Sequence, residues 1–480
     1  MRSTYLLTFS AVMLMSACSM MGPDYKRPAL LLPEGYSEGG KKPEVAADIA
    51  LKSEWWTLFG SEDLNQLIVQ SFMHNPSIDA GQAALRSAAE AVKAQEGLFS
   101  PQVNAGYSFQ RNKTPDLFAN PLSTNSTQYI YNLHTAQVNV SYTPDVFGLN
   151  GRSVESLEAQ RKSQAHLFSA TRITLAGNVT LAVIQEASLR EQLQITESLL
   201  KTQVDYLEAL KKQRAAGFNT EGDVAAQELA VANTEAMIPP IQKALQLQRD
   251  ALKTLVGVYG ADKIVAKFKL QDLSLPKDIP LTLPSQLLDK RPDILAAEES
   301  LHSASAAIGV AEAARYPQIT LGTNVIGQSG LTFGDLFKSV NSFWSLVGGM
   351  TVPVFDGGTL SARQRQALAN FDQAKAMYRQ TVLNAFQNVS DALAAAEADA
   401  EAVKRQQRAV AAAEKSLEIA KRQVKVGDLG VLALLPIEQN LLQAKLAVAQ
   451  TKGMQLSDAV ALCQALGGSW ADPIEPAKKS

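Results

Sequence analysis

Residues 102–110, QVNAGYSFQ, alternate between polar and apolar side chains, and this stretch decides the fold of the chain. Successive side chains of an extended strand point to opposite faces, so one face carries the apolar set Val103, Ala105, Tyr107 and Phe109. The other face carries only small or polar side chains, Asn104, Gly106, Ser108 and Gln110. Alternation of this kind predicts four strands, at about 102–110, 135–146, 318–326 and 343–354.

One apolar and one polar face suit a membrane barrel with lipid outside and water inside, and they also suit a soluble sheet packed against helices. The aromatic residues favour the barrel. Fourteen of the 31 lie in residues 99–147 and 316–355, around the predicted strands, as an interfacial girdle requires. Four strands cannot close a barrel, because the smallest bacterial ones have about eight. Several copies of the chain would therefore share one barrel, and an oligomer is predicted.

The chain contains one unit twice. Pro76 and Pro292 are 216 residues apart, Pro101 and Pro317 are separated by the same interval, and the sequences around the two members of each pair are alike. Each half has the pattern helix, strand, strand, long helix, helix. A repeat of this length is too large for a solenoid unit and indicates a duplication. The predicted division is a first repeat at 63–258, a linker at 259–283, a second repeat at 284–468 and a C-terminal tail at 469–480.

Two stretches without proline, 148–220 and 357–435, predict very long helices. Helices of about 65 residues, at roughly 1.5 Å per residue, are close to 100 Å long. In the second stretch apolar residues recur at intervals of four and three from Val382 to Val403, and then at sevens to Val424, which indicates a coiled coil. A rod or spacer would explain these helices but not the strands. The predicted fold is therefore mostly α-helical with a membrane β-barrel contribution.

The first residues predict an export signal and a lipid anchor. Residues 1–17 have the order of a secretory signal peptide, with Arg2, then an apolar stretch, then small residues before Cys18. A cysteine at this point resembles a bacterial lipobox, and the alternative is an ordinary signal followed by a chance cysteine. We expect Cys18 to carry covalent lipid such as palmitate, residues 18–62 to form a lipidated extended segment, and Ser19 to favour the outer membrane. Nowhere after the signal do 18 uninterrupted apolar residues occur, so no transmembrane helix is expected.

Composition argues against catalysis and against nucleic-acid binding. The net charge is −2, with 45 basic and 47 acidic residues, which gives no footprint for nucleic acid. The four histidines are scattered without metal-ligand spacing, so no metal site is predicted. Cys463 lies in a final apolar stretch and is expected to be a buried thiol rather than a nucleophile. We expect no enzyme activity, and no cofactor apart from the lipid on Cys18.

Five motifs occur in order along the chain: CSMMGPDYKRP at 18–28, LNQLI at 64–68, KRPDI at 290–294, YPQI at 316–319 and VPVFDGG at 352–358. As a set they resemble the TolC-like outer-membrane factor family, in its efflux lipoprotein branch of the OprM/NodT type. Each motif is weak alone, but the matches run from Cys18 to about Gly468 and are specific together.

The resemblance implies a homotrimer in which each chain gives four strands to a shared twelve-stranded barrel, above a long periplasmic coiled-coil α-barrel. It implies a passive outer-membrane exit duct for small molecules such as drugs, with a role in multidrug resistance. The implied partners are a periplasmic adaptor protein and an inner-membrane pump of the resistance-nodulation-division, ABC or major-facilitator type. Two alternatives remain: a duct for type I protein secretion and, with less support, a periplasmic coiled-coil lipoprotein scaffold.

In this family the turns at the periplasmic end of the helix pairs contact the adaptor and form a gate lined by carboxylates. The corresponding turns here lie at Gly217 and Gly427. Asp223 matches an acidic gate position of the first half, whereas Ala433 and Pro436 stand where relatives commonly carry aspartates. The other gate candidates are two possible sources of charge, Asp428 and Glu438, and two leucines, Leu432 and Leu435. These leucines either gate the duct by dewetting or simply pack the helices.

Overall fold

The computed structural model describes residues 20–29, 54–113, 130–259, 266–276 and 289–467. The chain forms two units, each assembled from both halves of the sequence. Unit 1 comprises Met1–Pro28, Leu85–Ser163 and Ala297–Tyr378. Unit 2 comprises Ala29–Ala84, Gln164–Ala296 and Arg379–Ser480. The predicted Cys18 anchor, the signal peptide and the C-terminal tail lie outside the described residues.

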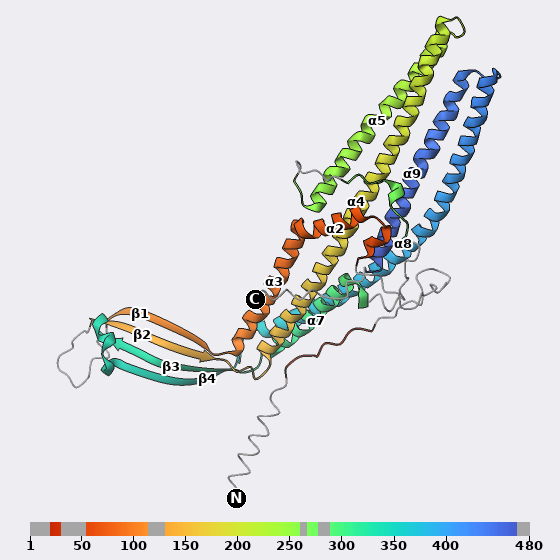
Figure 1. Ribbon diagram of the computed structural model, residues 1–480. Helices are drawn as coiled ribbons and strands as arrows, with labels where there is room; N and C mark the ends of the chain where they lie inside the picture. Colours follow the sequence, from red (N-terminus) through yellow and green to blue (C-terminus); the bar gives the residue numbers. More distant parts are fainter. Residues whose placement is uncertain (1–19, 30–53, 114–129, 260–265, 277–288, 468–480) are drawn as a thin grey trace, which may run out of the picture. The chain divides into compact units, whose positions relative to one another are not determined.

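Unit 1 contains a four-stranded antiparallel sheet in the order β1-β2-β3-β4 (Figure 1). The strands are β1 (Gln102–Lys113), β2 (Ile130–Tyr142), β3 (Gln318–Gly330) and β4 (Ser342–Thr351). Val103 pairs with Val140 and Phe109 pairs with His134, so the apolar members of β1 and β2 share one face. Among the described residues, β1 and β4 each have one unpaired edge.

Two of the four observed strands end earlier than predicted. β2 stops at Tyr142 rather than near 146, and β4 stops at Thr351 rather than near 354. Pro144 and Pro353 explain the difference, because proline has no N–H to give to a sheet ladder. β1 continues three residues beyond the predicted end, through Arg111 to Lys113.

The sheet is irregular at one level. The register shifts between Val138 and Asn139 in the β2–β3 pair, and between Asn324 and Gly327 in the β3–β4 pair. The Phe343 ring lies directly against Gly327, where a Cβ atom would collide with it. An extra residue in one strand increases local twist, and an aromatic ring over a glycine helps to fix the register.

Two helices are long, as predicted. α4 (Leu149–Ala215) has 67 residues and α8 (Thr359–Val426) has 68, so each is about 100 Å long. α5 (Glu221–Val256) returns alongside α4, and α9 (Leu434–Ala465) returns alongside α8 (Figure 1). The shorter helices are α2 (Glu62–His74), α3 (Pro76–Glu96) and α7 (Pro292–Ala313), and short 3-10 turns include η1 (Trp55–Phe59), η4 (Leu270–Asp272), η5 (Phe333–Phe337) and η7 (Val431–Ala433).

Two helical segments are long and apolar enough to cross a membrane by length and composition. They are α4, with a window of mean hydropathy 1.4, and Val431–Ala465, with a window of mean hydropathy 1.2. In α4, 56% of that window is buried within the protein, as expected for a helix in a protein core. The sequence analysis required 18 uninterrupted apolar residues and found no such run. A window of high mean hydropathy can contain some polar residues, and for this reason these two helices satisfy the second criterion and not the first.

Candidate functional site

The first turn, between α4 and α5, is closed by a left-handed glycine. Gly217 has φ +81°, its N–H bonds to the carbonyl of Arg214 at 2.9 Å, and the N–H of Phe218 bonds to Gln213 at 2.9 Å. An added Cβ would meet nothing within 4 Å, so conformation and not space requires glycine here. Phe218 beside it is 81% exposed, which leaves a large apolar side chain at the end of the helix pair.

Asp223 belongs to a capping box at the start of α5. Its carboxylate accepts the backbone N–H of Thr220 at 2.8 Å, and its own N–H donates to Thr220 Oγ1 at 3.2 Å. The hydrogen bond from the backbone of Thr220, and a second from its hydroxyl, hold the pKa of Asp223 below its usual value. The structure therefore places a charged, half-buried carboxylate six residues after Gly217, where it also satisfies the helix end.

The second turn, between α8 and α9, repeats the glycine but not the cap. Gly427 has φ +87°, and the N–H of Asp428 bonds to the carbonyl of Gln423 at 3.0 Å. Asp428 is exposed. α9 starts after η7, and Ala433 at its N-cap offers no side-chain hydrogen bond. Beside Gly427, Val426 is 71% exposed, so each turn presents an apolar side chain next to its glycine.

The apolar turn residues pack against the first helix pair. Leu432 and Val431 lie against a buried cluster formed by Leu207, Leu210, Val224 and Val231 of α4 and α5. Leu434 is buried and Leu435 is half-buried. Packing of the helices is therefore a sufficient reason for an apolar residue at position 432, and a gating role is not needed to explain it. A gating role for Leu432 and Leu435 stays a prediction.

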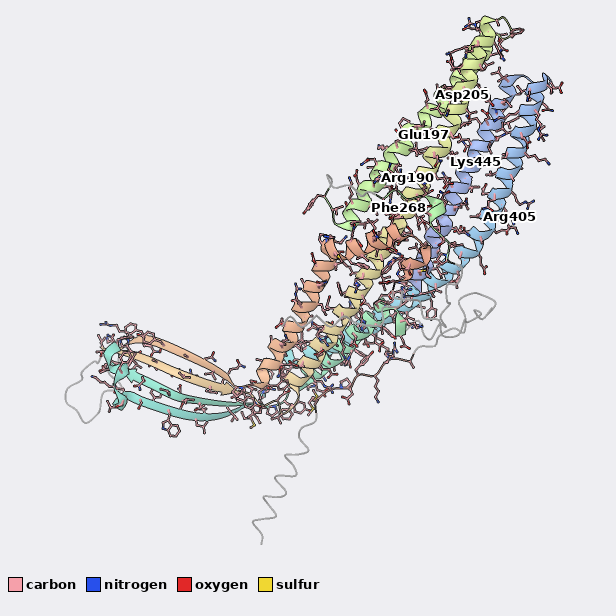
Figure 2. All side chains as sticks on the ribbon, viewed as in Figure 1. Arg190, Glu197, Asp205, Phe268, Arg405 and Lys445 are labelled. Atoms are coloured by element: carbon pink, nitrogen blue, oxygen red, sulfur yellow. The ribbon has the colours of Figure 1, made fainter. Side chains whose placement is uncertain are left out.

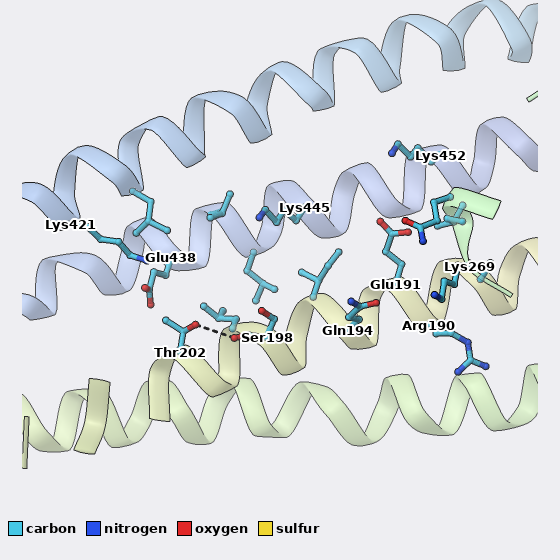
Figure 3. A pocket seen from close by; sticks show the side chains of 18 residues that line it. Arg190, Glu191, Gln194, Ser198, Thr202, Lys269, Lys421, Glu438, Lys445 and Lys452 are labelled. Atoms are coloured by element: carbon cyan, nitrogen blue, oxygen red, sulfur yellow. Dashed lines mark hydrogen bonds between the residues drawn. The ribbon is translucent and has the colours of Figure 1, made fainter. Parts of the chain in front are cut away.

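Glu438 lies inside unit 2. Its side chain is 2% exposed, and neither carboxylate oxygen has a hydrogen-bond partner among the described residues. Burial raises the pKa of Glu438, and the charge of Lys421 opposes that shift. Glu438 lines a cavity of about 590 Å³ between α4, α8, α9 and η4, with Lys421, Lys445 and Ser198 around it (Figure 3). The sequence cannot show this burial, because α9 is apolar on most of its faces.

The α4–α5 pair also buries a glutamate, but with partners. Glu186 is fully buried, with Arg190 at 2.5 Å and Arg249 at 3.4 Å from its Oε1 atom. Arg190 follows Glu186 by one helical turn on α4, and Arg249 comes from α5. Figure 2 shows Arg190 on α4 and Lys445 on α9. Lys445 in turn pairs with Glu414 of α8 at 2.9 Å, which ties the second helix pair together.

A carboxyl pair in α8 and α9 was not identified from the sequence. Burial, together with a hydrogen bond to Asp458 and its charge, raises the pKa of Asp399 to about 6. A sequence signal for this pair exists. Asp399 lies 29 residues before Asp428, and Asp458 lies 30 residues after it, so an antiparallel hairpin turning there brings the two together. Acidic residues equidistant from a predicted turn are therefore worth searching for.

In unit 1, residues 20–28 form an extended N-terminal strap along α4 and α7. The buried Arg152 donates to the carbonyl of Met21 at 2.9 Å and pairs with Asp24 at 2.9 Å. The Tyr25 ring stacks on His302 with centroids 4.5 Å apart, and burial raises the pKa of Tyr25.

The strap starts at the connection between β2 and α4. The N–H of Met21 bonds to the carbonyl of Phe147 at 3.2 Å, and Met20 packs against Gly148. The described part of the strap therefore begins at the end of the sheet where β2 leads into α4.

A sheet with an apolar face and unpaired edges, combined with helices about 100 Å long that turn back on themselves, defines the class of outer-membrane channel proteins. The family described as "Outer membrane efflux protein" matches residues 67–258 and 283–468. The chain belongs to this family. It is an efflux channel protein of the outer membrane and not an enzyme.

Individual relatives agree with the family. The chain is 30% identical to the pyoverdine export outer membrane protein OpmQ of Pseudomonas putida over 439 residues, 90% of this chain and 92% of the relative. It is 28% identical to the cation efflux system protein CusC of Escherichia coli over 97% of this chain and 98% of the relative. The structure resembles the outer-membrane channel OprN with a TM-score of 0.85 at 25% identity, covering 94% of this chain and 100% of that channel.

Proposed function

We propose that three copies of this chain form one duct, in which their sheets close into a twelve-stranded barrel and their long helices form a periplasmic tube. The observation that carries the proposal is the sheet itself, which has an apolar face and, among the residues that the structure describes, two unpaired edges. An open edge in lipid leaves backbone groups without partners, at a cost of several kcal/mol each. Joining β1 of one copy to β4 of the next removes every such edge.

The proposed cargo is a small molecule delivered by an inner-membrane pump through a periplasmic adaptor. The relatives are named for export of pyoverdine, antibiotics, toluene and cations, which supports small molecules rather than proteins. Passage through the duct is passive, because energy comes from the pump. Among the described residues, the polar face of the strands carries amides and hydroxyls such as Asn104, Ser108 and Asn139 and no carboxylate, a neutral lining that suits varied solutes.

The proposed anchor is lipid on Cys18. The strap begins two residues later, beside the β2–α4 connection. A lipid on Cys18 would therefore sit close to the periplasmic ends of the strands, and the β1–β2 and β3–β4 connections would face the outside. Acyl chains add about 0.8 kcal/mol of binding per buried CH₂, so several chains form a firm anchor.

The proposed adaptor contact is the pair of glycine turns. The exposed Phe218 and Val426 beside Gly217 and Gly427 support it, because exposed apolar side chains at a protein's tip favour contact with another protein. Asp223, which is half-buried, and Asp428, which is exposed, are the carboxylates proposed for the gate. The division into repeats at 63–258 and 284–468 remains our proposal for the origin of this arrangement.

Two neighbouring strand residues test the barrel. Leu346 is 76% exposed on the apolar face of β4, and Ser345 lies on the opposite face. Leu346→Arg places a charge in lipid, at a cost of roughly 2–4 kcal/mol near the midplane, while Ser345→Arg places the same charge in water. We expect Leu346→Arg to abolish the heat-sensitive trimer band from outer-membrane fractions and Ser345→Arg to retain it. Equal behaviour of the two variants would contradict a lipid-facing sheet.

A further inference from the structure

The apolar face of the sheet changes its chemistry along β1 and β2. Next to the β2–α4 connection it is aliphatic, with Val103 opposite Val140. Further along it becomes aromatic, where Phe109 lies opposite His134. At the far end it becomes cationic, with Arg111 opposite Asn132 and Lys113 opposite Ile130. Aliphatic, then aromatic, then basic is the order of groups that lipid presents from its tails to its headgroups.

The aromatic level is a connected cluster. Tyr107 Oη lies 2.8 Å from His134 Nδ1, and the Phe109 and His134 ring centroids are 4.8 Å apart. Phe333 of η5 contacts both Tyr107 and His134 edge-on, with centroids 6.1 and 6.3 Å away. Tyr107, Phe109 and Phe333 are nevertheless more than half exposed. Such rings, which combine an apolar body with polar atoms at one end, settle at the boundary between hydrocarbon and headgroups.

The two cations beyond this cluster have no partner in the part of the chain that the structure describes. Arg111 and Lys113 are exposed, and no carboxylate of the described residues pairs with either. Lys338, the cation that follows η5, differs because it is held by Asp335 at 2.6 Å. Within the described part of the chain, therefore, no carboxylate competes with an external anion for Arg111 and Lys113.

Their height matches the headgroup level. From Val103 to Lys113 the strand advances roughly 33 Å, and a tilt of about 45° reduces this to roughly 23 Å along the membrane normal. The apolar band of an outer-membrane barrel is about 25 Å tall. If Val103 lies near one border of that band, Lys113 lies near the other.

We propose that Arg111 and Lys113, backed by the aromatic cluster, bind the phosphate groups of phosphorylated lipids in the outer leaflet. This inference rests on the proposed membrane barrel and on the orientation that the strap gives it. A guanidinium offers a phosphate two parallel N–H donors, and the neighbouring ammonium adds a point charge. A lipid headgroup is favoured over free phosphate because only a lipid also covers the exposed rings.

The experiment compares the double variant Arg111→Ser/Lys113→Ser with the wild type in the full-length trimer. Both are reconstituted in phosphatidylcholine vesicles that contain a small fraction of lipid A, and lipid A retained per trimer is measured after mild extraction. We expect the double variant to bind lipid A at least about tenfold more weakly. Arg111→Lys should restore part of the binding. The matched control is Arg365→Ser/Lys375→Ser, which removes the same charges from exposed positions on α8 and should bind as the wild type does.

Two further arms decide the source of the phosphate. Dephosphorylated lipid A should bind the wild type as weakly as lipid A binds the double variant, and inorganic phosphate should not displace the lipid. Equal retention of lipid A by wild type and double variant, or displacement by free phosphate, would overturn the proposal. Failure of the barrel itself would look different, because no trimer would then be recovered from the vesicles of either protein.

Discussion

The two helix pairs of unit 2 each bury one glutamate, but they treat it in opposite ways. In α4–α5, Glu186 is paired with two arginines, one from each helix. In α8–α9, Glu438 has no hydrogen-bond partner among the described residues. The first pair also caps α5 with Asp223, whereas the second starts α9 without a side-chain cap. The two helix pairs therefore share a left-handed glycine at the turn, whereas the polar groups that stabilise them differ.

The largest effect is expected at Glu186. Glu186→Leu leaves Arg190 and Arg249 without their buried anion, and we expect the free energy of unfolding to fall by about 2–4 kcal/mol. Breaking a fully buried pair typically costs ~3–5 kcal/mol, and the value is smaller here because both arginines are 22% exposed. Denaturant titration of the detergent-solubilised protein measures the change. Glu197→Leu, at an exposed position of the same helix, is the control and should change little.

Replacing the buried glutamate of α8–α9 by leucine should change the free energy of unfolding in the opposite direction. Glu438→Leu removes a buried carboxyl that has no hydrogen-bond partner among the described residues, so we expect stability to rise by roughly 1–3 kcal/mol near neutral pH. The titration used for Glu186→Leu tests this. If Glu438→Leu destabilises the protein as Glu186→Leu does, the contrast between the two helix pairs is wrong.

Lowering the pH should also affect the stability of the two helix pairs differently. The pKa of Asp399 is raised to about 6, so its contribution to stability is fully present below the unfolded pKa and is lost as the pH rises through about 6. The pKa of Asp223 is lowered, so its contribution is present above the unfolded pKa and is lost as the pH falls. Between about pH 7.5 and about pH 4.5, α8–α9 should gain protection from hydrogen exchange while the start of α5 gains none.

Asp399→Asn is the variant that isolates the carboxyl pair. It should leave the fold intact and reduce the gain of protection in α8–α9 at low pH, after correction for intrinsic exchange rates; the part that comes from Glu438, whose pKa is also raised, should remain. If the gain is undiminished in Asp399→Asn, the carboxyl pair does not contribute to it.

The smallest structural effect is expected at Asp223, where charge and capping can be separated. Asp223→Asn keeps an oxygen that can accept the Thr220 N–H but removes the charge, and Asp223→Ala removes both. We expect both variants to alter the block of single-channel current by cations, and only Asp223→Ala to speed exchange at the start of α5. An unchanged current in both variants would remove Asp223 from the gate and leave it as a helix cap.

The sequence predicted the elements better than the environments of single side chains. Alternation of polar and apolar residues located all four strands. Long stretches without proline, together with the heptad spacing of apolar residues, located the two long helices. These signals depend only on residues near one another in the sequence. The ends of β2 and β4 were placed too late, although Pro144 and Pro353 marked them. The capping box of Asp223 was not predicted, although Thr220, three residues before it, is a sequence signal for one.

Burial of particular charges could not be predicted. Glu438 was chosen as a source of charge near the turn, but the face of α9 on which it lies depends on how α4 and α8 pack around it. Glu186 interrupts the apolar pattern of α4 in the sequence. Of the two arginines that pair with it, Arg190 lies one turn later on α4 and Arg249 lies on α5. Only the hairpin geometry brings Arg249 to it.

The measurement that tests the central claim most directly is the number of chains in the particle extracted from the outer membrane, determined by native mass spectrometry before and after heating. The account predicts three chains before heating and one afterwards, since the barrel closes only when three sheets meet. A single chain that leaves the membrane without detergent would contradict it.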